Sequence, residues 1–425
     1  MFNAEKELQK WAPVLDHADA TPIKDNYRRA VTAKLLENTE RACNEERGMN
    51  GMLTEAPNNT TGSITSYDPV LISLVRRAMP NLIAYDVAGV QPMSGPTGLI
   101  FAMKSRYGDG TPIVTGDPEA GFNEADTDFA GAGTHAGTDP TSAGLDSPES
   151  AYTTGTGIVT ATGEAAGPAE LGFTIEKATV TAKTRQLKAE YSMELAQDLK
   201  AIHGLDAEAE LANILSAEIL AEVNREVIRS INSTAKTGAS NVGTDGLFDM
   251  VADADGRWAI EKFKSLIYQL EVEANKIAQE TRRGKGNFVI ASSNVASALA
   301  AAGQLDYAPA MATDLNVDDT GNTFAGVLNG RLKVYVDPYA GADYATVGYR
   351  GTNPYDAGLF YCPYVPLTMV RAVDETTFQP KIAFKTRYGL QANPFVTTAA
   401  GIGSVNSNQY FRNIRVGNIN VGGQS

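Results

Sequence analysis

The spacing of apolar residues predicts two long helices in the middle of the chain. Leucine, isoleucine and valine recur every three or four positions in one segment, which places them on one face of a helix of about 25 residues. These positions are Leu211, Ile214, Leu215, Ile219, Val223 and Val227. A second long helix is predicted over residues 260–281, and it ends at the turn that begins with Arg282.

Strands are predicted where apolar and polar residues alternate, or where a short apolar run is bounded by turn residues. Residues 99–107 and 173–183 are predicted to pair with each other. A buried strand over 287–294 leads into a short capped helix over 295–302. Further strands are predicted over 332–336, 358–361 and 381–388. The expected fold class is therefore α+β, with separate β modules.

The N-terminal segment is predicted to be a helical arm. Asp25 can cap a helix that continues to Arg47 and stops at Gly48. Its apolar stripe is thin, so the helix needs a partner for stability. The stripe consists of Tyr27, Val31, Leu35 and Leu36. Residues 52–62 are rich in turn formers and read as an extended linker, and a short helix follows over 69–79.

The composition changes sharply between the two paired strands. Residues 108–172 contain no Lys or Arg and eleven Asp or Glu, with many Gly, Thr and Pro. Such a segment buries little apolar surface, which indicates an insertion, either a small β-rich module or a loose loop. The carboxylates raise the question of calcium, but the spacing of an EF-hand loop is absent, so a solvated acidic surface is favoured.

Length and charge limit the functions that remain. At 425 residues, with 43% apolar and 20% charged residues, the chain can form two or three domains of ordinary globular composition. No apolar run approaches the roughly 18 residues of a membrane span, and the start lacks a secretory pattern, so we expect a protein made in a cytoplasm. The net charge of −14 argues against binding nucleic acid through phosphates, although an acidic protein can still enclose DNA.

The sequence offers no catalytic, cofactor or metal site. The histidines are His17, His135 and His203, which is too few for a convincing triad, and His203 is interpreted as a helix-end residue. No GxSxG, phosphate-loop or dinucleotide motif is present. Cys43 and Cys362 are far apart and are predicted to be reduced. The basic turn 282–285 is interpreted as a solvated loop or a contact between subunits.

Two long segments resemble the major capsid proteins of T-even-type tailed bacteriophages. They are residues 75–96, VRRAMPNLIAYDVAGVQPMSGP, and residues 187–208, LKAEYSMELAQDLKAIHGLDAE. The resemblance covers most of the chain after about residue 52 and is weakest in the acidic insertion. It implies the fold of tailed-phage and herpesvirus shells, with an N-terminal arm, a protruding two-stranded loop, a peripheral domain around a long spine helix, and an axial domain.

On this resemblance the chain divides into six parts. They are an N-terminal propeptide or scaffold-contacting arm at 1–55, the arm of the mature subunit at 56–98, the protruding loop at 99–192 with its insertion module at 108–172, the peripheral domain with the spine helix at 193–281, the axial domain at 282–350, and closing peripheral strands at 351–425.

The resemblance also implies a function and a processing event. The subunit would assemble on a scaffold into hexameric capsomers of a head shell, and a prohead protease would cut after a glutamate preceded by Ile or Leu two positions earlier. Three segments fit that pattern: Leu53-Thr54-Glu55 before Ala56, Leu35-Leu36-Glu37 and Leu220-Ala221-Glu222. The first lies in the predicted linker and the others in predicted helices, so cleavage is predicted between Glu55 and Ala56.

The implied partners are other copies of the chain, a vertex capsid protein, a portal protein, the internal scaffold and the protease. Outer decoration proteins and a host or phage chaperonin are further candidates, and no cofactor is expected. Two alternatives stay open: the paralogous pentameric vertex protein of the same fold, and an enzyme with a β-rich insertion.

Overall fold

The computed structural model describes residues 4–16, 23, 25–50, 82–108, 113–114, 116–121, 124–137, 152–165, 168–204, 206–254, 256, 258–303, 305–306, 323–374, 376–377, 379–397 and 399–419. The predicted cleavage site at Leu53–Ala56 and the predicted helix at 69–79 lie outside these residues. The chain is an α+β protein of two compact units. One contains Met1–Ile100 with Ala178–Ser425, and the other contains Phe101–Lys177.

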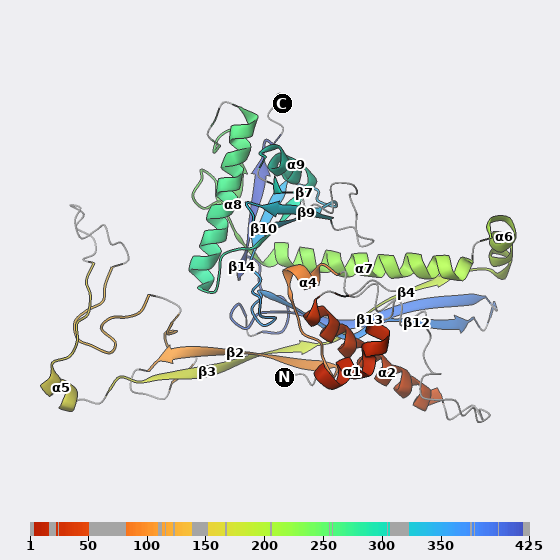
Figure 1. Cartoon of the computed structure of the whole chain (residues 1–425), viewed down its shortest axis with the longest axis horizontal. Helices are drawn as coiled ribbons and strands as arrows, with labels where there is room; N and C mark the ends of the chain where they lie inside the picture. The colour runs from red at the N-terminus through yellow and green to blue at the C-terminus, as the bar shows by residue number, and fades with distance from the viewer. Residues whose placement is uncertain are drawn as a thin grey trace. The chain divides into compact units, whose positions relative to one another are not determined.

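A four-stranded sheet carries the long central helix of the first unit. Its strand order is β1-β12-β13-β4, with β1 parallel to β12 and the other pairs antiparallel. The bounds are β1 Gly89–Val90, β12 Leu359–Val373, β13 Pro380–Ala392 and β4 Lys183–Glu190. Helix α7 (Ala207–Thr234) starts at the N-cap Asp206 and runs along this sheet in contact with β4 and β13 (Figure 1). This confirms the predicted long helix.

The second sheet of this unit has the order β5-β14-β11-β7-β10-β9-β8, and β6 also pairs with β14. Its strands are β5 Ala235–Thr237, β6 Leu247–Asp249, β7 Phe288–Ser292, β8 Leu305–Asp306, β9 Thr323–Leu328, β10 Leu332–Asp337, β11 Tyr344–Gly348 and β14 Asn408–Gly417. Helices α8 (Ala259–Thr281) and α9 (Ser293–Ala301) pack on it. Leu266, Leu270 and Ile277 of α8 enter the same buried cluster as Val289 and Val334.

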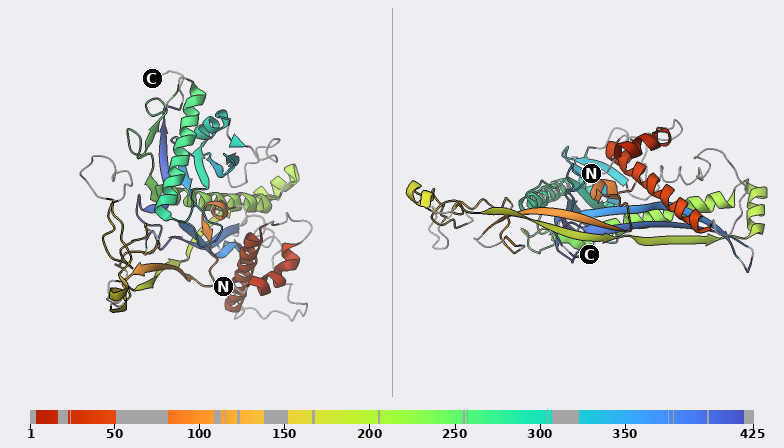
Figure 2. Two further views of the ribbon diagram at one scale, coloured as in Figure 1. Left: turned by 60° about the vertical axis from the view of Figure 1, so that its left-hand side comes forward. Right: turned by 90° about the horizontal axis from the view of Figure 1, so that it is seen from below.

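The N-terminal residues form a helical hairpin that packs on the four-stranded sheet. Helix α1 (Ala4–Leu15) contacts α2 (Asn26–Asn50), and α2 contacts β12. Both views of Figure 2 show the red α1–α2 hairpin beside the blue strands. The thin apolar stripe of α2 therefore has the partner that the sequence analysis required. The helix continues past Gly48, where the prediction ended it.

The remaining elements confirm the predicted strand pair. β2 (Thr97–Tyr107) and β3 (Leu171–Thr181) form a two-stranded sheet. The insertion between them contains short bridges and the helix α5 (Thr160–Ala165) in its described part. The other helices are α4 (Ala84–Val87) and α6 (Met193–His203). Helix α6 begins at Ser192, whose side chain accepts a hydrogen bond from the Leu195 N–H, and ends at Gly204 in the left-handed conformation.

One position of the predicted apolar face of α7 was wrong. Ile214 was placed on the buried face, but it is 61% exposed, whereas Leu215, Ile219, Val223 and Val227 are buried. The helix runs at 3.6 residues per turn, so Ile214 and Leu215 point about 100° apart and the sheet covers only the second.

Candidate assembly surfaces

The ribbon of β2 and β3 exposes its apolar side chains. Along both strands exposed positions alternate with half-buried or buried ones, as the two-residue period of a strand requires. Six of the exposed positions carry large apolar side chains, namely Leu99, Phe101, Met103, Leu171, Phe173 and Ile175, and others carry polar residues such as Ser105 and Lys177. Phe101 is 62% exposed and Phe173 is 65% exposed. Exposed large apolar side chains gathered on one ribbon are typical of a protein contact site.

Charged residues occupy opposite positions of the same ribbon, where Arg106 is buried and Lys104 and Glu176 are half-buried. Lys104 Nζ lies 2.9 Å from Glu176 Oε2, and Arg106 Nη2 lies 3.0 Å from Glu176 Oε1. The Nε of Arg106 also donates to Thr174 Oγ1 at 2.9 Å, and its Nη1 donates to the Asp117 carbonyl. The segment containing Asp117 runs beside β2, because Arg106 and Glu119 form an antiparallel bridge. The paired charges leave the apolar face as the one directed outward.

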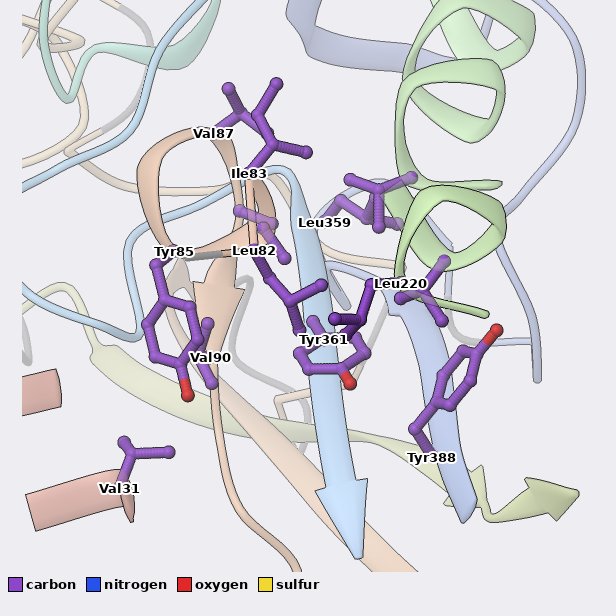
Figure 3. Close-up of a cluster of buried hydrophobic side chains, with 14 of the residues drawn as sticks. Val31, Leu82, Ile83, Tyr85, Val87, Val90, Leu220, Leu359, Tyr361 and Tyr388 are labelled. Carbon is purple, nitrogen blue, oxygen red and sulfur yellow. The ribbon is translucent and has the colours of Figure 1, made fainter. Parts of the chain in front are cut away.

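The second surface is the face of the four-stranded sheet that the α1–α2 hairpin covers. Val31 of α2 joins a buried cluster with residues of α4, β1 and β12. Figure 3 shows this cluster, with the Tyr85 hydroxyl pointing toward Val31 and with Leu220 of α7 beside Leu359 and Tyr361. The turn before α4 is fixed by Asn224 of α7, whose Oδ1 accepts a hydrogen bond from the Ile83 N–H at 3.1 Å.

A cavity of about 730 Å³ lies beside β4, β13 and α7 and contains charged side chains. Arg185 Nη1 lies 2.6 Å from Glu222 Oε2, its Nη2 lies 2.5 Å from Glu226 Oε2, and its Nε donates to Tyr388 at 2.9 Å. The Tyr388 hydroxyl donates to Glu226 as well. Burial, together with the hydrogen bond to Glu226, raises the pKa of Tyr388. These groups satisfy one another and fasten α7 to the sheet, so they form a structural network.

The histidines and cysteines do not come together in the described residues. His203 is the exposed last residue of α6, as predicted for a helix end. His135 lies in the insertion, where its backbone N–H donates to Asp128. Cys362 is a buried free thiol in β12. His17 and the side chain of Cys43 lie outside the described part of the chain.

The remaining chemical possibilities are equally limited. Within the described ranges no group of three His, Cys, Asp or Glu side chains can hold a metal ion. None of the helices described there has the length and apolar character needed to cross a membrane. In the basic turn, Lys285 pairs with Glu271 of α8 and Arg283 lies 3.5 Å from Asp356. These charges are engaged within the chain.

Sequence reasoning located the paired strands but missed which of their faces is exposed. The alternation of Phe101, Met103, Phe173 and Ile175 was visible in the sequence. A signal for the direction of the alternation was also present, because Lys104, Arg106 and Glu176 occupy the other face and could compensate one another. This signal depends on the pairing of the two strands, which the sequence analysis did predict, so the exposed face could have been assigned.

Comparison with known proteins agrees with a structural role. The model of the family described as "Major capsid protein Gp23" matches residues 64–416. The chain is 45% identical to the major capsid protein of Salmonella phage ViI, covering 96% of this chain and 97% of that protein. It is 38% identical to the major capsid protein of Enterobacteria phage T4, with 96% and 98% covered.

The same comparison separates the two capsid alternatives. The capsid vertex protein of phage T4 is 30% identical over only 53% of this chain and 54% of its own length. The major capsid proteins match at higher identity over nearly the whole chain. The chain therefore belongs to the Gp23 family of major capsid proteins of T4-like phages, and it is a structural component of the virion's capsid shell, not an enzyme.

Proposed function

We propose that this chain assembles into hexameric capsomers that form the phage head, and that the outward apolar face of the β2–β3 ribbon is a contact between subunits. That exposed face carries the proposal. Six large apolar side chains on a ribbon with paired charges on its other side need a protein cover in the assembled particle. Many such contacts, repeated over a closed shell, add to a large collective stability.

The finer architecture is part of the same proposal. α7 serves as the spine helix, the β2–β3 ribbon as the protruding loop, and the segment 282–350 as the axial domain. The acidic insertion at 108–172 extends that loop. The vertex protein, the portal, an internal scaffold, decoration proteins and a chaperonin are its proposed partners. The DNA is enclosed without specific binding, in keeping with the net charge of −14.

The chain is further proposed to be a precursor that a prohead protease cuts between Glu55 and Ala56. The support is the Leu53-Thr54-Glu55 sequence, together with the fact that the two competing glutamates, Glu37 and Glu222, lie in the helices α2 and α7. Helical backbone fits a protease site poorly. N-terminal sequencing of the shell protein from mature particles should give Ala56, and a start at Met1 would overturn the cleavage.

The ribbon contact is tested by substitution. Phe101→Ser and Phe173→Ser remove exposed apolar surface and should leave folding nearly unchanged, because surface changes usually alter stability by less than about 0.5 kcal/mol. Both should reduce the yield of closed shells in electron micrographs. Val405→Ser, at an exposed position in the loop before β14, is the matched control and should assemble normally. Normal assembly of both ribbon variants would refute the contact.

A further inference from the structure

The α1–α2 hairpin covers one definite surface of the rest of the chain. We call this surface the seat, and it consists of α4, β1, residues 91–94 and β12. The apolar side chains Val31, Leu35 and Leu36 of α2 are buried in one cluster with residues of the seat such as Val90. Figure 2 shows the hairpin beside the strands that include β12, and Figure 3 shows Val31 of α2 near Tyr85 and Val90 of the seat.

Hydrogen bonds across this contact run in one direction, from donors on α2 to acceptors on the seat. Arg28 Nη2 lies 2.6 Å from Asp86 Oδ1. Asn38 Nδ2 donates to the Met93 carbonyl at 2.8 Å and to the Tyr364 carbonyl at 2.9 Å. One amide group therefore joins residues 91–94 to β12. The seat is thus complementary to a helix that presents an apolar stripe and hydrogen-bond donors.

Two further donors extend the pattern. The Tyr27 hydroxyl donates to the Val90 carbonyl, and Arg41 Nη1 lies 3.4 Å from the Ser94 carbonyl. Burial raises the pKa of Tyr27, so this hydroxyl keeps its proton and remains a donor at neutral pH. The contact thus includes donors over most of the described length of α2.

The contact is nevertheless incompletely satisfied. Asn38 Oδ1 and the Tyr85 hydroxyl are both buried, and neither has a hydrogen-bond partner among the described residues. Water can bond both groups once the helix and the seat separate. The two unsatisfied groups therefore make the contact weaker than its buried area alone would suggest, and they favour reversible dissociation.

The hairpin is also held together by ion pairs of its own. Lys34 Nζ lies 2.6 Å from Glu7 Oε1, and Arg29 Nη2 lies 2.6 Å from Asp16 Oδ2. Lys10 pairs with Glu37 at 2.8 Å. These bonds join α1 to α2 and do not involve the seat, so the hairpin can leave the seat without breaking them.

We infer that the seat is a reversible binding site for the α1–α2 hairpin, and that a cut between Glu55 and Ala56 opens it by removing the covalent tether. This rests on the cleavage proposed above. Before the cut the hairpin and the seat belong to one covalent chain, so their contact is intramolecular; at an effective concentration on the order of 1 mM, a contact with a dissociation constant of ~0.05 mM is almost fully occupied. At a free concentration of about 1 μM the same contact is almost empty after the cut.

The test uses the full-length chain with residues 53–56 replaced by the recognition sequence of an unrelated site-specific protease. The cut is then independent of the phage protease. After cutting, the fragment and the body are separated by size-exclusion chromatography over a dilution series. The two pieces should elute together at high concentration and apart on dilution. Isothermal titration of the separated fragment into the cut body should recover the same dissociation constant.

Asn38→Ala removes both bonds to Met93 and Tyr364, and it should raise that dissociation constant by roughly tenfold. Asn26→Ala changes an exposed asparagine of the same helix and should leave it unchanged. If uncut Asn38→Ala fails to melt cooperatively, Arg28→Gln, which removes the pair with Asp86, takes its place with an increase in the same direction.

Three outcomes would overturn the inference. The first is a fragment that stays bound at nanomolar concentration. The second is a fragment that does not rebind at about 1 mM, which is comparable to the concentration in the uncut chain. The third is an equal dissociation constant for Asn38→Ala and Asn26→Ala. None of them bears on where the phage protease cuts. Conversely, a mature N-terminus other than Ala56 would refute the cleavage and leave these binding measurements standing.

Discussion

Arg225 of α7 holds Asp337 at the end of β10, with its Nη1 at 2.6 Å from Oδ1 and 2.7 Å from Oδ2. The Asp337 side chain is fully buried, and it also accepts hydrogen bonds from the Tyr344 hydroxyl at 2.6 Å and the Tyr339 N–H at 3.0 Å. This carboxylate therefore joins the long helix to the eight-stranded sheet. A buried charge with several partners stabilises only while those partners are present.

Asp337→Ala should lower the free energy of unfolding by about 3–5 kcal/mol, because it leaves Arg225 and Tyr344 without their shared acceptor. Urea denaturation measures this change. Lys188→Ala is the control, since Lys188 is 69% exposed and pairs with Glu190 on the surface of β4, where a loss below about 1 kcal/mol is expected. A loss below about 1 kcal/mol for Asp337→Ala would show that the contact of Asp337 with Arg225 and Tyr344 contributes little to the free energy of unfolding.

The contrast between the buried face of α7 and the Arg225–Asp337 pair shows what the sequence can predict. Leu215, Ile219 and Val223 follow a local period, and that period alone determines the helix and its buried face. Arg225 and Asp337 are 112 positions apart, and nothing near either residue indicates the other. The strand β11 was also missed, because it lies in the middle of the sheet and lacks the alternating pattern of a half-exposed strand.

The assembly surfaces show the same contrast between features that a local pattern predicts and contacts between residues far apart in the sequence. The thin stripe of Val31 and Leu35 predicted that α2 needs a partner, and the structure supplies one. Which partner could not be predicted, because Asn38 binds Met93 and Tyr364, and these lie 55 and 326 positions away. The cleavage at Glu55 stays a prediction that rests on the family resemblance.

A second buried ion pair gives a prediction about coupling. Glu273 of α8 is fully buried, and its Oε2 lies 2.7 Å from Nε of Arg412 in β14. Its Oε1 accepts hydrogen bonds from the Ala239 N–H at 3.0 Å and from Gln269 at 2.9 Å. Glu273→Met should therefore destabilise by about 3–5 kcal/mol, since Arg412 keeps only its pair with Glu280 and a long hydrogen bond to the Thr237 carbonyl.

The double variant with Glu273→Met and Arg412→Met should lose clearly less stability than the sum of the two single variants, with a coupling of about 1–3 kcal/mol. Urea denaturation of the wild type, both single variants and the double variant completes the cycle. Additive losses would mean that the two residues act separately, and that the geometry of the pair contributes nothing of its own.

Cys362 should be unreactive in the folded protein. Burial raises the pKa of this thiol to about 12, so at pH 8 roughly one molecule in ten thousand carries the reactive thiolate. In a Cys43→Ser variant, which leaves Cys362 as the single cysteine, an alkylating reagent should label the chain only after denaturation. Mass spectrometry follows the labelling. A native rate close to that of a free peptide thiol would place Cys362 at the surface.

The pairing of α1 with α2 should weaken in acid. Partial burial alone would raise the pKa of Glu37, but hydrogen bonds from Lys10 at 2.8 Å and from Trp11 Nε1 at 3.2 Å, with the charge of Lys10, hold it below its ordinary value of 4.5. A carboxyl whose pKa is lowered by folding stabilises the folded form above its ordinary pKa. That contribution is lost as the pH falls from 4.5 through the lower folded value.

Tryptophan fluorescence can follow this loss directly, because the chain contains two tryptophans. Trp11 is 6% exposed in the hairpin and Trp258 is 73% exposed, so Trp258→Phe leaves Trp11 as the reporter. Its emission should shift to longer wavelength below pH 4.5, while far-UV circular dichroism tracks general acid unfolding. Adding Glu37→Gln removes the titrating group, so the emission wavelength of Trp11 should depend less on pH. An identical acid shift with Glu37→Gln would assign it to other carboxylates.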